Sequence, residues 1–120
     1  MSLDKMRVAE VTKIARVAHE VNRAYCLALG DTSQVAWEEA SSGIRASAIG
    51  GVLYHQAHPD ATPEGSHENW MKAKIKDGWI LGPVKDEALK THPSLVPYEE
   101  LDESERAKDY LFRGVVKALF

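Results

Sequence analysis

Two histidine–glutamate pairs are the part of this sequence that most resembles a catalytic motif. His19 and His67 each precede a glutamate, as the first histidine does in the H-E-x-x-H motif of zinc proteases. That motif needs a second histidine four residues later, so that two imidazoles share one helix face and one metal ion. Arg23 and Met71 stand at those positions instead. We therefore expect no metal site at either pair.

The remaining candidate nucleophiles lack the surroundings that catalysis requires. Cys26 is the one cysteine, and it falls inside a predicted helix without an activating neighbour. Ser94 and Ser104 are not in a nucleophile elbow, and no glycine-rich phosphate loop occurs. We expect a buried structural thiol at Cys26, no catalytic residue and no cofactor. A Cys26–histidine pair, or a metal held by some of the five histidines, remains the alternative.

The composition describes one small globular domain. With 120 residues, 44% of them hydrophobic and 28% charged, the chain suffices for a single core. A formal net charge of −3 argues against general nucleic-acid binding, which needs a clustered basic surface. The sequence contains no run of about 18 apolar residues and no signal-peptide pattern, and a lone cysteine fits a reducing compartment. We therefore expect a cytoplasmic protein that binds neither membranes nor nucleic acids.

The elements that must position these residues are mainly helices. An apolar stripe between residues 5 and 29 predicts a first helix that ends at Gly30. A short stretch at 34–40 contains Trp37, and a second helix is predicted over 43–56, capped by Ser41 or Ser42. The predicted buried positions of the two helices are Val11, Ile14, Ala18, Val21 and Tyr25, and Ile44, Ala48 and Val52.

The second half of the chain is divided by glycine and proline. Thr62 as N-cap and a following proline predict a third helix over 63–77, which stops at Gly78. Residues 79–85 should be extended with a turn at Gly82 and Pro83, and residues 86–97 should be irregular. Asp102 and Glu105 resemble a capping box for a last helix that reaches the C-terminus. Its predicted buried stripe is Ala107, Leu111, Val115 and Ala118. We find no internal repeat and expect a mainly α, compact bundle of about four helices with a short β element.

One stretch differs from ordinary helical sequence. It contains H-E-N-W at 67–70, D-G-W-I-L-G-P-V-K-D at 77–86 and H-P-S-L-V-P-Y-E-E-L at 92–101. This succession resembles the RyR domain, a repeat found in tandem pairs in ryanodine receptors and singly in bacterial and phage proteins. The resemblance predicts a single RyR-type domain over 1–120, with the repeat motif at 59–120 and an N-terminal helical extension at 1–58. Within the extension, residues 14–26, 29–31 and 37–38 resemble small stand-alone phage and bacterial members.

The resemblance implies a small-molecule binding module that is not an enzyme. In the receptors an adenine nucleotide binds between paired repeats, and the stand-alone members suggest a nucleotide sensor in phage–host conflict. The alternative is a protein-interaction adaptor that uses exposed aromatic side chains and the acidic run at 98–103.

The candidate ligand-binding residues lie mainly in the repeat motif. Trp70 and Trp79 offer flat surfaces for a base, and Lys85 is placed to meet a phosphate. His67 and Tyr98 would supply orienting hydrogen bonds. Four of these residues also have a structural interpretation: Trp79 and Trp70 as core, Lys85 as a solvated partner of a neighbouring aspartate, and Tyr98 as an anchor for the irregular segment. His92 is interpreted only as a second anchor for that segment.

A single copy of the motif leaves two ways to form a site between repeats. In the first, two chains form a homodimer that brings two copies of Trp70 face to face. In the second, the N-terminal extension replaces the missing repeat and closes the pocket within one chain through Trp37 or Arg23. The two versions predict one ligand per dimer and one ligand per chain, respectively.

Overall fold

The computed structural model describes residues 3–120, with side chains described for all of these except 3, 4 and 6. Residues 1 and 2 of the predicted 1–120 domain lie outside it. The described elements are α1 (Leu3–Ala28), the 3-10 helix η1 (Trp37–Glu39), α2 (Ser42–Ala57), α3 (Pro63–Lys76), β1 (Ile80–Leu81), β2 (Thr91–His92), the 3-10 helix η2 (Tyr98–Glu100) and α4 (Glu103–Leu119). The prediction of a four-helix fold with a short β element is confirmed.

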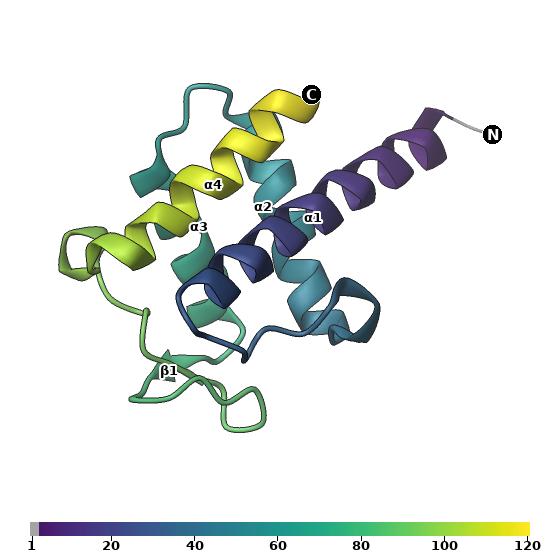
Figure 1. The fold of residues 1–120 in the computed structure, drawn as a ribbon. Helices are drawn as coiled ribbons and strands as arrows, with labels where there is room; N and C mark the ends of the chain where they lie inside the picture. The colour runs from purple at the N-terminus through teal and green to yellow at the C-terminus, as the bar shows by residue number, and fades with distance from the viewer. Residues whose placement is uncertain (1–2) are drawn as a thin grey trace.

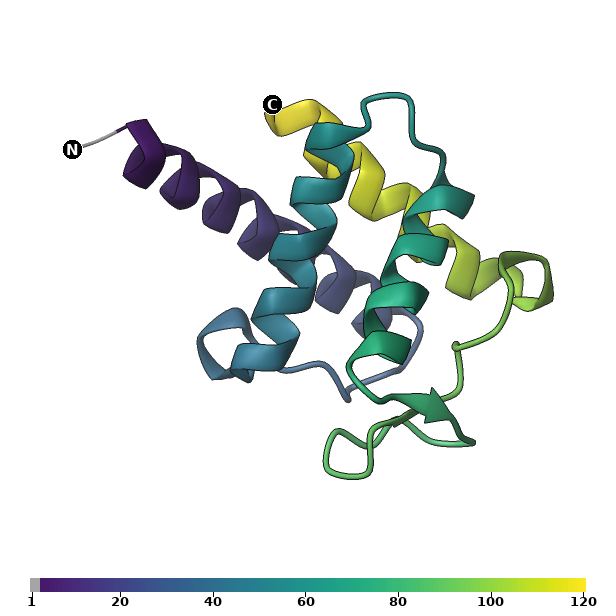
Figure 2. The same ribbon diagram turned by 180° about the vertical axis from the view of Figure 1, so that it is seen from behind.

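The four helices enclose one core. Helices α1 and α4 run antiparallel beside each other (Figure 1), while α2 and α3 form the opposite side (Figure 2), and the N-terminal turns of α1 extend beyond the other helices. The apolar stripe of α1 packs inward, with Val11 and Ile14 beside Trp37, Val52 and Val116. Cys26 is buried, as predicted. None of the helices within residues 3–120 is both long and apolar enough to span a membrane.

The helix boundaries follow local hydrogen bonding closely. The hydroxyl of Thr62 accepts from the N–H of Gly65 (3.1 Å), and Ser41 caps α2 in the same way. Gly78 has φ +91°, a conformation that side chains resist, and it ends the turn after α3. Asp102 caps α4 by accepting from the N–H of Glu105 (2.9 Å). These sequence predictions are confirmed, because each depends on residues within one turn of the boundary.

Two predictions about α4 are wrong in part. Ala118 is exposed, and the deeply buried residue of this helix is Val116. The helix packs against α1, α2 and α3 together, so its buried surface is wider than one stripe and ends before its last turn. The reciprocal half of the capping box is also absent. The carboxylate of Glu105 bonds Ser94 and Lys108 instead of the N-cap N–H.

A parallel pair of short strands lies between α3 and η2. Ile80 pairs with Thr91 and Leu81 with His92. The extended conformation is confirmed at Ile80–Leu81, and the chain bends at residues 83 and 84, close to the predicted turn. The segment 86–97, which we predicted to be irregular, contains β2. Strand pairing joins residues about ten positions apart, and no local pattern in 86–97 specifies it.

Several hydrogen bonds in the first half of the chain have equivalents in the second half, although no internal repeat was expected from the sequence. Because a carbonyl oxygen only accepts, His19 on α1 donates from Nε2 to the oxygen of Val35 (2.6 Å). In the same way His67 on α3 donates from Nε2 to the oxygen of Val96 (2.7 Å). A glycine with positive φ follows each histidine by 11 positions. In these two features α1 and the loop that follows it correspond to α3 and the segment that follows it.

Two arginines complete the match. Arg45 on α2 donates to the first two carbonyl oxygens of η1, and its guanidinium lies 5.4 Å from the ring centre of Trp37. Arg106 on α4 donates to the first two carbonyl oxygens of η2 and lies 5.7 Å from the ring centre of Tyr98. The unit α1–η1–α2 is thus repeated as α3–η2–α4, and the β1–β2 segment is an insertion in the second unit only.

Candidate ligand-binding site

A cavity of about 410 Å³ lies among the four helices and is partly open to solvent. This volume falls within the range of small-molecule sites, roughly 300–1,000 Å³. Side chains from all four helices and from the inserted β1–β2 segment line it. The N-terminal segment therefore contributes directly to the cavity wall, through α1, α2 and the loop that joins them.

Equivalent positions of the two repeats line this cavity. The repeats align when His19 is matched to His67 and Arg45 to Arg106. The matched lining pairs are Ala18 and Ser66, His19 and His67, Asn22 and Trp70, Ile44 and Glu105, Ser47 and Lys108, Gly50 and Leu111, and Gly51 and Phe112. The cavity thus lies between the two repeats of one chain, and its two sides carry different chemistry.

Four of the six predicted site residues line the cavity: Trp70, Trp79, Lys85 and His67. The other two do not. The ring centre of Tyr98 lies 6.1 Å from that of His67 and 5.7 Å from the guanidinium of Arg106, and these contacts anchor η2. Arg23 pairs with Glu20 at 3.2 Å.

Trp37, the other residue predicted to close a pocket within one chain, is in the hydrophobic core and is only 7% exposed. The N-terminal segment closes the cavity with Ala18, His19, Asn22 and Gln34 instead. These side chains come from α1 and the loop after it.

The two tryptophans that line the cavity differ in their solvent exposure. Trp79 is 5% exposed, and the Nζ of Lys74 lies 4.6 Å from its ring centre. The structural interpretation of Trp79 as core is confirmed, and its ring serves as a wall. Trp70 is half-buried, and the ring of His92 lies steeply inclined to it at 4.9 Å between ring centres. The ring of His67 lies 5.5 Å from it, tilted by 30°. Of the two tryptophans in the cavity wall, Trp70 is therefore the more exposed.

Three lysines reach the cavity from three elements: Lys74 from α3, Lys85 from the β1–β2 segment and Lys108 from α4. Lys85 keeps contact with solvent, but surrounding protein atoms partly desolvate its ammonium group and lower its pKa. Burial also lowers the pKa of Lys74, and the charge of Lys85 adds to this effect. Among residues 5–120 neither lysine forms an ion pair.

The third lysine is paired. Lys108 donates to Oε1 of Glu105 at 3.0 Å. Burial would lower the pKa of Lys108, but the hydrogen bond and charge of Glu105 outweigh burial and raise it. The cavity lining therefore holds more positive than negative charge, and Lys74 and Lys85 form no ion pair within the described part of the chain, an arrangement suited to an anion.

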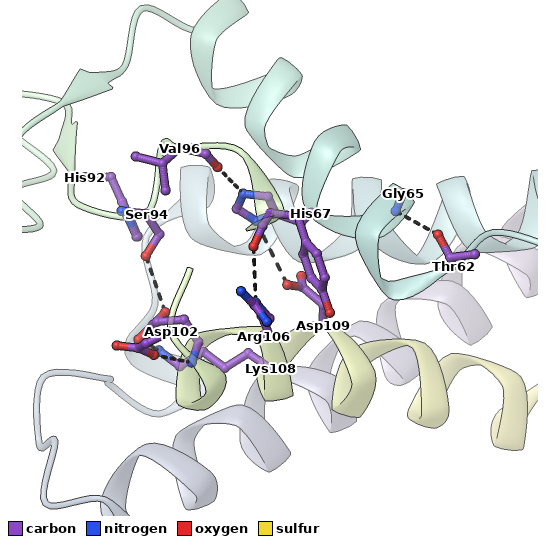
Figure 3. Close-up of polar contacts among 12 residues, drawn as sticks. Thr62, Gly65, His67, His92, Ser94, Val96, Asp102, Arg106, Lys108 and Asp109 are labelled. Atoms are coloured by element: carbon purple, nitrogen blue, oxygen red, sulfur yellow. Dashed lines mark hydrogen bonds and ion pairs between the residues drawn. The ribbon is translucent and has the colours of Figure 1, made fainter. Parts of the chain in front are cut away.

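The segment between β2 and η2 is tied to α3 and α4 by polar contacts (Figure 3). His67 donates to Val96, and its Nδ1 lies 4.0 Å from Oδ2 of Asp109 on α4. Burial, aided by the charge of Glu105, raises the pKa of Asp109 to about 7. Because protein groups face both nitrogens of His67, this residue holds the wall in place and leaves no nitrogen for a ligand.

His92 has the opposite arrangement. Its Nδ1 accepts from the N–H of Ser94 at 3.0 Å, so the proton of the neutral ring is on Nε2. No residue in the described part of the chain accepts from that Nε2. Burial, followed by the charges of Lys85, Lys74 and Lys108, lowers the pKa of His92 to about 4, so the ring is neutral near pH 7.

Sequence reasoning missed Asn22, Lys74, His92 and Lys108. Lys74 lies four positions after Trp70 and Lys108 three positions after Glu105, so helical spacing places each beside a recognised neighbour. Asn22 is a polar residue near the predicted apolar stripe of α1, and its Oδ1 is buried without a hydrogen-bond partner. His92 was assigned only a structural role. The described residues contain no group of three His, Cys, Asp or Glu side chains arranged for a metal.

Comparison with models of known protein families assigns the repeat motif to one of them. A sequence model of the RyR domain matches residues 54–120, more than half of the chain. The chain belongs to the RyR domain family. The match begins within α2, slightly before the predicted boundary at 59, so α1 and most of α2 precede the RyR match. Those helices nevertheless repeat the contacts of α3 and α4, and the RyR motif residues Trp70, Trp79 and His92 face a cavity shared with them.

Proposed function

We propose that this RyR-domain protein is a non-enzymatic module that binds a small nucleotide-like ligand, with an adenine nucleotide as the best candidate. The observation that carries the proposal is the 410 Å³ cavity in which a half-buried tryptophan, Trp70, accompanies three lysines. Such a site offers stacking for a base and positive charge for a phosphate. Base–aromatic stacking contributes roughly 1–3 kcal/mol per base.

Two features of the wall support a base with an amino group. Trp70 offers the accessible ring, and its equivalent in the first repeat is Asn22. The Oδ1 of Asn22 is an acceptor with no protein partner, and leaving such a group unpaired costs about 1–3 kcal/mol. An exocyclic amino group that reaches it would recover part of that cost. The exposed Lys85 then meets the ligand's negative charge near the opening.

We also propose one ligand per chain. The cavity lies between two repeats of the same chain, so a second copy is not needed to supply the second side. The homodimer in which two copies of Trp70 share one base is the rival arrangement. For the biological setting we propose a cytoplasmic nucleotide sensor in phage–host conflict, on the resemblance to stand-alone phage and bacterial members of the family.

A protein-interaction adaptor is the second candidate, and the inserted segment favours it. Ile80, Leu81, Val84 and Leu89 are each at least 58% exposed. The carboxylates of the 98–103 run are also largely exposed. Apolar side chains gathered in one exposed segment are a common feature of protein-binding surfaces.

A thermal-shift screen with nucleotides separates the two candidates. A ligand at 100 times its dissociation constant adds about 2.7 kcal/mol of stability, a shift of several degrees for a domain of this size. We expect AMP to raise the melting temperature of the wild type and to have little effect on Trp70→Ala. Failure of every nucleotide to shift the wild type would refute the proposal. Mass spectrometry of small molecules that co-purify with the protein identifies the ligand without a prior choice.

A further inference from the structure

His92 is a neutral hydrogen-bond donor held in one orientation at the cavity wall. The N–H of Ser94 occupies its Nδ1, and the rings of Trp70 and Trp79 lie 4.9 and 6.3 Å from the imidazole, centre to centre. Ser94 is itself fixed to α4, since its hydroxyl donates to Glu105 at 3.3 Å. The imidazole therefore has one remaining polar atom, the Nε2–H, and no described protein group accepts from it.

The same region collects positive charge from three elements. Lys74, Lys85 and Lys108 are all close enough to His92 for their charges to oppose its protonation, together with the nearby His67. Glu105 is the one carboxylate in the cavity wall. The lining therefore holds three ammonium groups and one carboxylate, while Asp31, Asp77 and Glu87 lie outside the lining and also act on these lysines. A phosphate monoester carries about −1.5 to −2 at neutral pH, and its charge suits a wall that is lined by three ammonium groups.

The charge belongs to the second repeat and its insertion. At the positions equivalent to Glu105 and Lys108, the first repeat has Ile44 and Ser47, which are uncharged. Lys85 and His92 come from the β1–β2 segment, which the first repeat lacks. The second repeat and its insertion together therefore supply the three lysines and His92, and this end of the cavity is the basic one.

We propose that this end of the cavity is a phosphate subsite, in which Nε2–H of His92 donates to a dianionic phosphate group surrounded by Lys74, Lys85 and Lys108. The inference rests on the proposed function, because it assigns the ligand's phosphate to particular residues of the same cavity. It also applies to free inorganic phosphate, whose chemistry is the same. No bond is made or broken, and the subsite only binds.

Calorimetric titration with three probes tests the subsite: AMP, adenosine and inorganic phosphate. A hydrogen bond to a charged group contributes about 1.5–3 kcal/mol, which corresponds to about a 10- to 100-fold change in affinity. We expect AMP to bind at least about tenfold more tightly than adenosine. His92→Phe and Lys85→Ala should each remove most of this advantage and leave the affinity for adenosine nearly unchanged.

Two control variants complete the experiment. His92→Gln keeps an amide N–H near the position of Nε2 and should retain part of the AMP advantage. Lys72→Ala removes an exposed lysine of α3 that does not line the cavity, and it should bind AMP like the wild type. Thermal unfolding of each variant without ligand confirms that it folds. If His92→Phe does not fold, Lys85→Ala decides the test, since Lys85 is exposed.

The outcomes separate this inference from the proposed function. Equal affinities for AMP and adenosine, or an AMP advantage unchanged by both variants, overturn the phosphate subsite while a nucleoside pocket survives. Binding of phosphate without binding of adenosine, with AMP no tighter than phosphate, supports the subsite and refutes the adenine nucleotide. If neither AMP nor phosphate binds at millimolar concentration, the subsite is wrong.

Discussion

The Nζ of Lys74 lies 4.6 Å from the ring centre of Trp79, and both residues line the same cavity. The ammonium group is partly desolvated and forms no ion pair among the described residues. The Trp79 ring and the nearby charges of Asp77 and Glu87 favour its charged form. The indole N–H of Trp79 in turn lies 3.3 Å from Oδ2 of Asp77. Trp79 thus joins the turn after α3 to a cation of the candidate site.

Trp79→Ala should lower the free energy of unfolding by about 3–5 kcal/mol, the range for truncating a buried large aromatic residue. The physical reason is the loss of a side chain that is only 5% exposed and that packs beneath the inserted segment. Chemical denaturation measures the change. A loss below about 1 kcal/mol would show that Trp79 contributes little to the core.

The neighbouring glycines of α2 should respond oppositely to alanine. A Cβ on Gly51 would lie 2.7 Å from the ring of Phe112, whereas a Cβ on Gly50 meets nothing within 4 Å. Gly50→Ala should therefore stabilise the protein by about 0.5–1 kcal/mol, the gain from replacing glycine in a helix. Gly51→Ala should destabilise it by about 1–2 kcal/mol, because the ring of Phe112 on α4 must shift from its packed position. Equal effects of the two changes on urea denaturation would argue against this close approach.

Features that depend on neighbouring residues could be predicted from the sequence, whereas features that depend on the packing of distant helices could not. Thr62, Gly78 and Asp102 mark helix ends through bonds to residues three or four positions away, and all three predictions hold. Trp70 and Lys85 were found from a family motif. Lys74 and Lys108 were not, because only the packing of α3 against α4 shows that they share a cavity.

The internal repeat was missed for a related reason. It is carried by contacts, such as the bond from His19 to Val35 and that from His67 to Val96, and few of the aligned residues are identical. The insertion also shifts the spacing: Val35 follows His19 by 16 positions, and Val96 follows His67 by 29. No fixed sequence period therefore exists.

Asp109 should make stability depend on pH in a predictable direction. Its pKa in the folded protein is about 7, raised by burial, against about 3.9 for an unfolded chain. Between these values the folded state holds a proton that the unfolded state has lost, so stability falls as pH rises through this window. Asp109→Asn removes the effect. Relative to the wild type, the variant should gain roughly 2–4 kcal/mol between pH 4 and pH 8, at about 1.36 kcal/mol per pKa unit.

Urea denaturation of both proteins at each pH gives this difference directly. The titration of His92, whose pKa is lowered to about 4 by burial and the nearby lysines, affects the stability of both proteins and cancels in their difference. The depressed pKa of His92 acts in the other direction, because its stabilising contribution is lost as pH falls from about 6.5 toward 4. A difference between variant and wild type that stays constant from pH 4 to pH 8 would contradict the assignment of a buried, protonated Asp109.

The most direct test of the central claim is a calorimetric titration of AMP into the wild type and Trp70→Ala, with light scattering on the same samples. The cavity between the two repeats predicts one AMP per chain, no requirement for a dimer, and an affinity reduced about tenfold or more in Trp70→Ala. Half-occupancy in a dimer would instead support a base shared between two chains. An unchanged affinity in Trp70→Ala, or the absence of binding by the wild type, would contradict the account.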